Sequence, residues 1–210
     1  MHPTSNCRID VNAYCNNLDV QTAITFTSSS INNNWYVGGD WTTVAGTTNN
    51  FYGRLNFVDT GDITNNVYYN HMILGAGTIN SNGYDIFVRT RFTSTSNNVR
   101  ALLLDNSTFS IGGAATYNSY PRALWNTSNS ANLTINDGLI HIQSMNNSNN
   151  KSIHFGNNNL QYDSVIVEAN NYELDLYGAS NFNYAEWNGD LLVRGNNTYD
   201  TLVFLSLIHI

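Results

Sequence analysis

The sequence predicts an all-β fold, specifically a parallel β-helix (β-solenoid) of roughly 20–25 residues per coil, in one domain over residues 1–204. Short apolar-x-apolar segments recur along the chain, and such alternation places successive side chains on opposite faces of a strand. Clusters of Gly and Asn separate these segments and supply turns that need a positive φ. No window combines helical periodicity with helix caps. These three observations together favour stacked short strands.

Residues 173–204 show the pattern most clearly, with three short strands separated by Gly and Asn. Two or three inward side chains per strand bury too little surface to form a core alone, whereas stacked copies would bury a continuous one. The apolar positions of these strands are Leu174/Leu176, Leu191/Val193 and Leu202/Phe204.

The first half of the chain carries the same pattern less regularly. A segment richer in Ser, Asn and Tyr, residues 114–130 with Pro121, is predicted to be a loop that bulges from the stack. The strands expected before it have their apolar residues at Ile9/Val11/Ala13, Leu18/Val20, Ile24/Phe26, Trp35/Val37/Trp41, Leu55/Phe57, Val67/Tyr69, Ile73, Ile79, Ile86/Val88, Leu102/Leu104 and Phe109/Ile111.

The second half repeats more evenly. Apolar pairs that begin at Leu133, Ile153 and Leu174 recur at about the length of one coil. An antiparallel β-sandwich is the alternative fold, and it would show tight hairpin turns. Asn-Gly, the strongest hairpin signal, occurs only at 82–83 and 188–189, whereas paired Asn residues occur at many breaks. Asn side chains can hydrogen-bond in a ladder when equivalent turns are stacked, which favours the first fold.

The content of charged and apolar residues limits which partners the chain is expected to bind. Only 11% of residues are charged and the net charge is −7, with 8 Lys and Arg in 210 residues. Phosphate binding needs clustered Lys and Arg, so we expect no nucleic-acid partner. No apolar run is long enough to span a bilayer, so we expect no membrane span. The oligomeric state has no sequence signal.

Both ends of the chain are predicted to be truncated. Residues 205–210, LSLIHI, resemble the conceptual translation of a sequencing adaptor and are expected to be a non-native tail. The N-terminal residues lack a signal-peptide pattern, and we expect the signal peptide to have been lost by truncation. Cys7 and Cys15 could form a disulfide or remain small buried side chains, and the spacing alone leaves both open.

Catalytic signals are weak, so we expect no catalytic, cofactor or metal residues. The Asp59-Thr60-Gly61 triplet resembles half of an aspartic-protease site, but the required second copy is missing. His141 and His154 lie in expected strands without a third metal ligand. The C-terminal acidic residues could serve glycoside hydrolysis or calcium binding, or simply solubilise the surface. They are Asp163, Glu168, Glu173, Asp175, Glu186 and Asp190.

Aromatic residues suggest a binding surface. Tyr117, Tyr120 and Trp125 fall in the predicted loop and are candidate contacts for a polysaccharide or a cell-surface glycan. Trp35 and Trp41 fall in expected strands, where aromatic side chains more often belong to the core.

Five segments share a similar apolar-x-apolar pattern: 9–11, 18–20, 133–136, 191–193 and 197–204. They resemble the repeats of large bacterial surface proteins with parallel β-helix regions, of the kind exported by type IX secretion, and the resemblance covers most of the chain. It implies an extracellular or cell-surface location and a non-enzymatic structural or adhesive role. A carbohydrate-active β-helix enzyme (a polysaccharide lyase or glycoside hydrolase) or a glycan-binding module is the alternative function.

Overall fold

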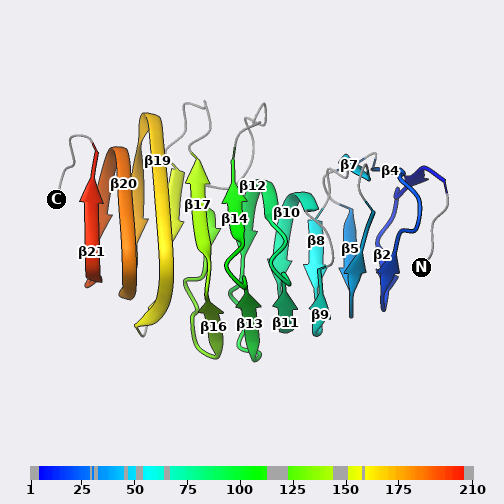
Figure 1. Cartoon of the computed structure of the whole chain (residues 1–210), viewed down its shortest axis with the longest axis horizontal. Coiled ribbons are helices and arrows are strands. Elements are labelled where there is room, and N and C mark those ends of the chain that lie inside the picture. The colour runs from blue at the N-terminus through cyan, green and yellow to red at the C-terminus, as the bar shows by residue number, and fades with distance from the viewer. Residues whose placement is uncertain are drawn as a thin grey trace.

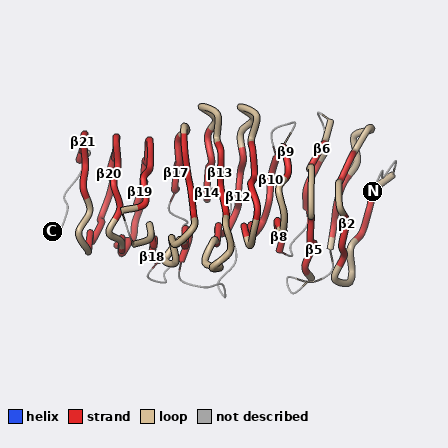
Figure 2. Tube along the Cα trace, turned by 90° about the horizontal axis from the view of Figure 1, so that it is seen from below, coloured by secondary structure: helices blue, strands red, loops and turns tan. Residues whose placement is uncertain are grey.

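The computed structural model confirms the all-β class. It describes residues 5–28, 30, 33–44, 47–50, 54–63, 67–112, 123–143, 151–157 and 159–205. Strands and loops make up this part of the chain, and it contains no helix (Figure 2). The strands follow one another along the long axis, from β2 near one end to β21 at the other (Figure 1).

The strands form four sheets, and every strand pairing is parallel. A three-stranded sheet contains β1 (Cys7–Arg8), β4 (Thr25–Thr27) and β7 (Thr48–Asn50), and a two-stranded sheet contains β3 (Leu18–Asp19) and β6 (Trp41–Thr42). A four-stranded sheet contains β9 (Gly61–Asp62), β11 (Gly77–Asn80), β13 (Arg100–Leu103) and β16 (Leu133–Asn136). The 12-stranded main sheet contains β2 (Ala13–Cys15), β5 (Asn34–Val37), β8 (Arg54–Phe57), β10 (Val67–Leu74), β12 (Ile86–Thr93), β14 (Thr108–Ile111), β15 (Ala123–Asn126), β17 (Leu139–Gln143), β18 (Lys151–His154), β19 (Leu160–Tyr177), β20 (Ser180–Arg194) and β21 (Thr198–Phe204).

The main sheet contains a closed, barrel-like circuit of parallel strands. Its order runs β14-β17-β19-β18-β15-β12, and a further pairing of β12 with β14 completes the circuit. Closure arises because β12 and β19 are long. The first part of β12 pairs with β14 and its last residues pair with β15. In the same way, β19 pairs first with β17 and then with β18.

This connectivity contradicts the predicted parallel β-helix of roughly 20–25 residues per coil. That prediction requires separate sheets and an even repeat, whereas here long strands join two sets of partners. Paired residues are also unevenly spaced in the sequence. Leu55 pairs with Met72, 17 residues later, whereas Phe92 pairs with Trp125, 33 residues later. The antiparallel β-sandwich is wrong as well, because the pairings are parallel.

The predicted loop over residues 114–130 is also corrected. It contains β15, and Leu124 and Trp125 of this strand are buried. Residues 113–122 lie outside the described residues. Sequence alone did not indicate this strand because it is short and is flanked by Ser and Asn.

Alternation of side chains builds the core. In β5, Trp35 and Val37 are fully buried, while Asn34 and Tyr36 point outward and are partly exposed. The residues that pair with Trp35 on successive strands also point inward, so seven buried side chains form one row, or file, along the main sheet. They are Trp35, Leu55, Met72, Phe92, Trp125, Ile153 and Leu176. Burial of this apolar surface is the main favourable term for the fold.

Asn occupies many of the tight corners, as the sequence predicted. Four Asn residues have a positive φ, between 52° and 65°, a conformation that Asn adopts more readily than most residues. They are Asn82, Asn106, Asn132 and Asn159. Two side-chain ladder contacts between Asn residues occur in the described part of the chain, from Asn129 Nδ2 to Asn97 Oδ1 at 2.7 Å and from Asn34 Nδ2 to Asn12 Oδ1 at 3.3 Å. Many other Asn side chains bond to the backbone of a neighbouring strand or turn, as Asn132 does to the Asn97 carbonyl.

Both cysteines are free and partly buried. Burial raises the pKa of both thiols, and the Trp35 indole donates a hydrogen bond to Cys15 Sγ at 3.3 Å. Residues 206–210 of the predicted adaptor tail lie outside the described residues. Leu205, the residue before them, is exposed and donates its backbone N–H to the Trp187 carbonyl at 3.2 Å.

Candidate functional site

Two adjacent files of outward side chains run along the outer face of the main sheet. We call the first the tyrosine file, and its members face one another across successive parallel strands. It consists of Tyr14, Tyr36, Asn56, Ile73, Thr93, Asn126, His154, Tyr177 and Arg194. All nine are outward because their sequence neighbours on the strands supply the buried inner files.

Stacked rings lie toward the two ends of the tyrosine file. The rings of Tyr14 and Tyr36 are 4.6 Å apart and nearly parallel, at 7°. The rings of His154 and Tyr177 are 4.9 Å apart at 10°, and the Arg194 guanidinium lies 5.8 Å from the centre of the Tyr177 ring. Because stacked rings cover each other's faces, they offer mainly their polar edges to solvent. The outermost ring, that of Tyr14, is 72% exposed.

The second file, which we call the arginine file, lies two residues earlier on the same strands. Asn34, Arg54, His71 and Arg91 face one another in it, from β5, β8, β10 and β12. Arg91 Nε donates a hydrogen bond to His71 Nε2 at 2.8 Å. His71 is only 3% exposed although it points outward, whereas Arg54 and Arg91 remain partly exposed.

Burial and charge keep His71 neutral. Desolvation, together with the positive charges of Arg91 and Arg54, lowers the pKa of His71 to about 2. A neutral imidazole can accept the bond from Arg91, and the two guanidinium groups carry the charge of the file. The arginine file therefore has a fixed positive charge at neutral pH.

The two files together make an extended polar face with a regular repeat. Adjacent parallel strands are about 4.8 Å apart, so side chains of the tyrosine file recur at that interval. The polar groups gather toward the two ends of the file, because Asn56 is only 7% exposed, Ile73 is apolar and the Thr93 hydroxyl is buried in its middle part. Such a row of donors and acceptors suits a linear polymer that carries many hydroxyl groups.

Acidic groups gather elsewhere, on the outer face of the neighbouring part of the main sheet. His141 Nε2 lies 3.0 Å from Glu168 Oε1, which joins β17 to β19. On β20, Glu186 accepts hydrogen bonds from Tyr184 Oη at 2.7 Å and from Asn188 Nδ2 at 2.8 Å. The hydrogen bond from Tyr184 is the main reason that the pKa of Glu186 lies below its ordinary value.

These pairings do not favour acid–base catalysis. A catalytic carboxylic acid needs a raised pKa at the working pH, whereas Glu186 is held as a carboxylate. Asp175 forms an ion pair with Arg194 at 3.5 Å. Within the described ranges, no group of three or more His, Cys, Asp or Glu side chains gathers in a way that could hold a metal ion.

Of the three residues predicted to contact a glycan, Trp125 alone lies in the part of the chain that the structure describes. Trp125 is fully buried, and its indole N–H lies 3.1 Å from Thr127 Oγ1 and 3.2 Å from Tyr162 Oη. A side chain without exposed surface cannot stack on a sugar, so Trp125 belongs to the core. Tyr117 and Tyr120 lie outside the described residues.

Other motifs from the sequence are structural. Trp35 and Trp41 are buried, as their strand positions indicated, and their rings pack edge to face at 5.1 Å. Asp59 Oδ1 accepts the backbone N–H of Thr60 at 2.8 Å, so the Asp-Thr-Gly triplet is a turn. His154 belongs to the tyrosine file, where burial lowers its pKa.

Sequence reasoning missed the two outward files. The signal lies in the middle residue of each apolar-x-apolar segment, for example Tyr14 between Ala13 and Cys15, and Tyr36 between Trp35 and Val37. Recognising these middle residues as one surface requires the strand register, which uneven spacing hides.

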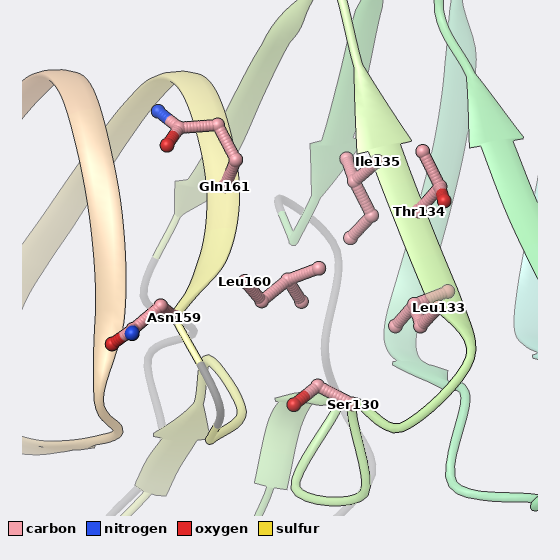
Figure 3. A pocket seen from close by; sticks show the side chains of 7 residues that line it. All are labelled: Ser130, Leu133, Thr134, Ile135, Asn159, Leu160 and Gln161. Atoms are coloured by element: carbon pink, nitrogen blue, oxygen red, sulfur yellow. The ribbon is translucent and has the colours of Figure 1, made fainter.

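A cavity of about 240 Å³ lies between β16 and the start of β19 (Figure 3). Leu160 extends from β19 toward Leu133 and Ile135 on β16, and Asn159 and Gln161 flank it. The cavity is smaller than typical sites for small molecules, and its centre is apolar. It carries no group suited to catalysis, and we assign no ligand to it.

Comparison of the chain with protein-family models, curated proteins and solved structures finds no match. The described residues contain no helix long and apolar enough to cross a membrane.

Proposed function

We propose that this chain is a non-enzymatic structural and adhesive segment of a secreted or cell-surface bacterial protein. The observation that supports this most strongly is the outer face of the main sheet, where the tyrosine and arginine files run side by side across successive strands. A long, regular, polar face suits attachment to a polymer. On the acidic part of the main sheet, Glu168 is paired with His141, and Glu186 accepts hydrogen bonds from Tyr184 and Asn188, which supports a structural role for these two carboxylates.

The structural part of the role follows from the parallel pairing. Backbone hydrogen bonds between strands run along the long axis, and the buried inner file continues beside them. The eight strand-to-strand steps of the tyrosine file, at about 4.8 Å each, span about 38 Å. A segment built in this way holds the chain entering at one end well away from the chain leaving at the other.

The adhesive part of the role assigns a polysaccharide or cell-surface glycan as partner. Sugar hydroxyls bond well to Tyr and Asn side chains, and Tyr14, Asn126 and Tyr177 of the tyrosine file are exposed or partly exposed. The outermost ring, Tyr14, has an exposed face on which a sugar could stack. The resemblance to type IX secretion cargo supports an extracellular location for such contacts.

Affinity electrophoresis against a panel of linear polysaccharides tests the adhesive role. We expect retardation by at least one polymer, and we expect Tyr14→Ala and Tyr177→Ala to reduce it. Tyr84→Ala is the matched control, because Tyr84 is also exposed but lies in a turn away from the file. Equal losses in all three variants, or no retardation by any polymer, would contradict the proposal.

The same panel tests the non-enzymatic role. Reducing-end and unsaturated-product assays after long incubation should show no cleavage of the bound polymer. Turnover that disappears in Glu168→Gln would favour the carbohydrate-active alternative instead. For the location, labelling of intact source cells with an antibody against the folded chain should detect it at the surface, and detection only after lysis would oppose that placement.

A further inference from the structure

Hydrogen bonding in the arginine file fixes the position of the His71 proton. An arginine side chain donates and never accepts, so His71 Nε2 must be the acceptor of the 2.8 Å bond from Arg91 Nε. A neutral imidazole carries one proton, which therefore lies on Nδ1. His71 consequently presents an N–H donor on the side of the ring away from Arg91.

Two donors in this file have no acceptor. His71 Nδ1 and Arg54 Nε are both buried and have no hydrogen-bond partner. They belong to residues that face each other directly on β10 and β8. Buried donors are almost always satisfied. Six other buried polar atoms of the described residues also lack a hydrogen-bond partner, but only Arg54 Nε and His71 Nδ1 belong to residues paired with each other across neighbouring strands, and this pairing indicates a shared missing acceptor.

The charge around these donors indicates what kind of acceptor fits. Arg54 and Arg91 flank the neutral His71, so the missing group sits in a positive field. Arginine recognises carboxylate and sulfate oxygens especially well, because the ion charge and the directed N–H bonds act together. An anionic acceptor would satisfy both hydrogen bonds and also lie close to the positive charge of Arg54.

We propose that Arg54 and His71 form a binding site for an oxyanion, a carboxylate or sulfate group that accepts from Arg54 Nε and His71 Nδ1. Where this anion belongs to a sugar, the inference rests on the proposed glycan-binding function. Asn56 and Ile73 of the tyrosine file lie two residues after Arg54 and His71 on the same strands. A polymer along the tyrosine file would thus bring its acidic substituents to the arginine file.

Isothermal titration of the full chain with three probes tests the site: sodium sulfate, a polyuronate and a neutral glucan, all at constant ionic strength. We expect saturable binding of sulfate and of the polyuronate, weakened at least tenfold in Arg54→Gln. Arg8→Gln is the control, since it removes the same charge from an exposed ion pair with Asp10. Equal weakening in both variants would mean non-specific charge attraction and would overturn the site.

The probes separate this inference from the proposed function. Binding of the neutral glucan without either anion would leave glycan binding in place and overturn the oxyanion site. Binding of sulfate without any polymer would keep the site and overturn the glycan function.

A second measurement needs no variant. Nitrogen-15 NMR of the unmodified chain should show His71 as the Nδ1–H tautomer and a shift of its Nδ1 signal as sulfate is added. An Nε2–H tautomer, or an Nδ1 signal that does not respond to sulfate, would overturn the proposal.

Discussion

Arg100, Arg54 and His71 all carry buried side-chain nitrogen atoms, but the surroundings of these atoms differ completely. Arg100 is 1% exposed and donates to the carbonyls of Asn98, Asn129 and Ala131 and to Ser94 Oγ, at 2.7–3.0 Å. Arg54 Nε and His71 Nδ1 are equally buried and have no acceptor. A satisfied cluster holds the chain together, whereas an unsatisfied one is prepared for a group that the chain does not supply.

The Arg100 cluster links distant parts of the chain. Its acceptors lie on the turns that precede β13 and β16, and Ser94 in turn donates to the Leu74 carbonyl at 3.0 Å. One guanidinium thus replaces water for several backbone groups at once.

The largest expected effect is therefore the loss of Arg100. We expect Arg100→Met to lower the free energy of unfolding by about 3 kcal/mol, because the carbonyls it satisfies would be left buried without donors. Urea unfolding followed by circular dichroism measures this. Arg8→Met, at an exposed ion pair, should cost less than about 1 kcal/mol. Similar losses in the two variants would show that the Arg100 bonds are not stabilising.

The second effect is the contribution of His71 to the pH dependence of stability. Its pKa in the folded chain is about 2, below the ordinary value near 6.5, so protonation favours the unfolded state. The neutral form contributes fully above about pH 6.5, and stability should fall by up to about 1.4 kcal/mol per pH unit below it. Arg54 and Arg91, which face His71, keep their charge throughout this range.

Unfolding curves of the parent and His71→Asn at several pH values between 7.5 and 5, where the expected loss reaches about 2 kcal/mol, isolate this contribution. The difference in stability between the two should change steadily with pH. A constant difference would mean that His71 titrates normally in the folded chain.

The third effect concerns the tyrosine file beside these residues. Tyr36→Ala removes the ring stacked on Tyr14 and should lower the free energy of unfolding by about 1 kcal/mol. Tyr84→Ala in a turn should leave stability nearly unchanged. If Tyr36→Ala also leaves the free energy of unfolding unchanged, the stacking of Tyr36 on Tyr14 does not stabilise the fold and contributes only to binding.

The smallest effect is expected for the loss of Arg54, and it gives the clearest contrast with the loss of Arg100. Arg54→Met removes an unsatisfied buried donor and one of two neighbouring positive charges, so we expect stability to change by less than about 0.5 kcal/mol. The same urea series reports it. A loss as large as that of Arg100→Met would mean that Arg54 is a structural residue.

Local features of the fold could be predicted from the sequence. The all-β class is confirmed, because the apolar-x-apolar segments do place residues such as Trp35 and Val37 in the core. Asn82 and Asn132 at the corners adopt the left-handed conformation that was predicted from the Asn clusters between the strands. These features depend on a few residues that are close in the sequence, so a short stretch of sequence is enough to predict them.

The connectivity could not be predicted, because it depends on strand length. Ala169 is followed by two consecutive Asn residues, a sequence that is typical of a turn. The strand β19 nevertheless continues through them to Tyr177, with a shift in register. That continuation lets β19 pair with both β17 and β18 and closes the circuit. A local composition rule cannot distinguish a turn from an irregularity within a strand.

The candidate site was missed for a related reason. Arg54, His71 and Arg91 are 17 and 20 residues apart, and nothing in their local sequence marks them as neighbours. Trp125 was assigned to a binding loop because its flanking residues are polar, although its strand packs the indole inside. Only the register shows which outward residues share a face.

Thermal unfolding of the parent chain and Arg54→Gln over a range of sulfate concentrations tests the central claim most directly. Sulfate stabilises most proteins to a similar degree, so the difference between the two chains reports specific binding. We expect the Tm of the parent to rise more steeply with sulfate concentration than that of Arg54→Gln, and the difference between the two Tm values to reach a plateau. The Tm of Arg54→Gln should show only the non-specific rise that sulfate causes in most proteins. Parallel curves for the two chains would contradict the central claim.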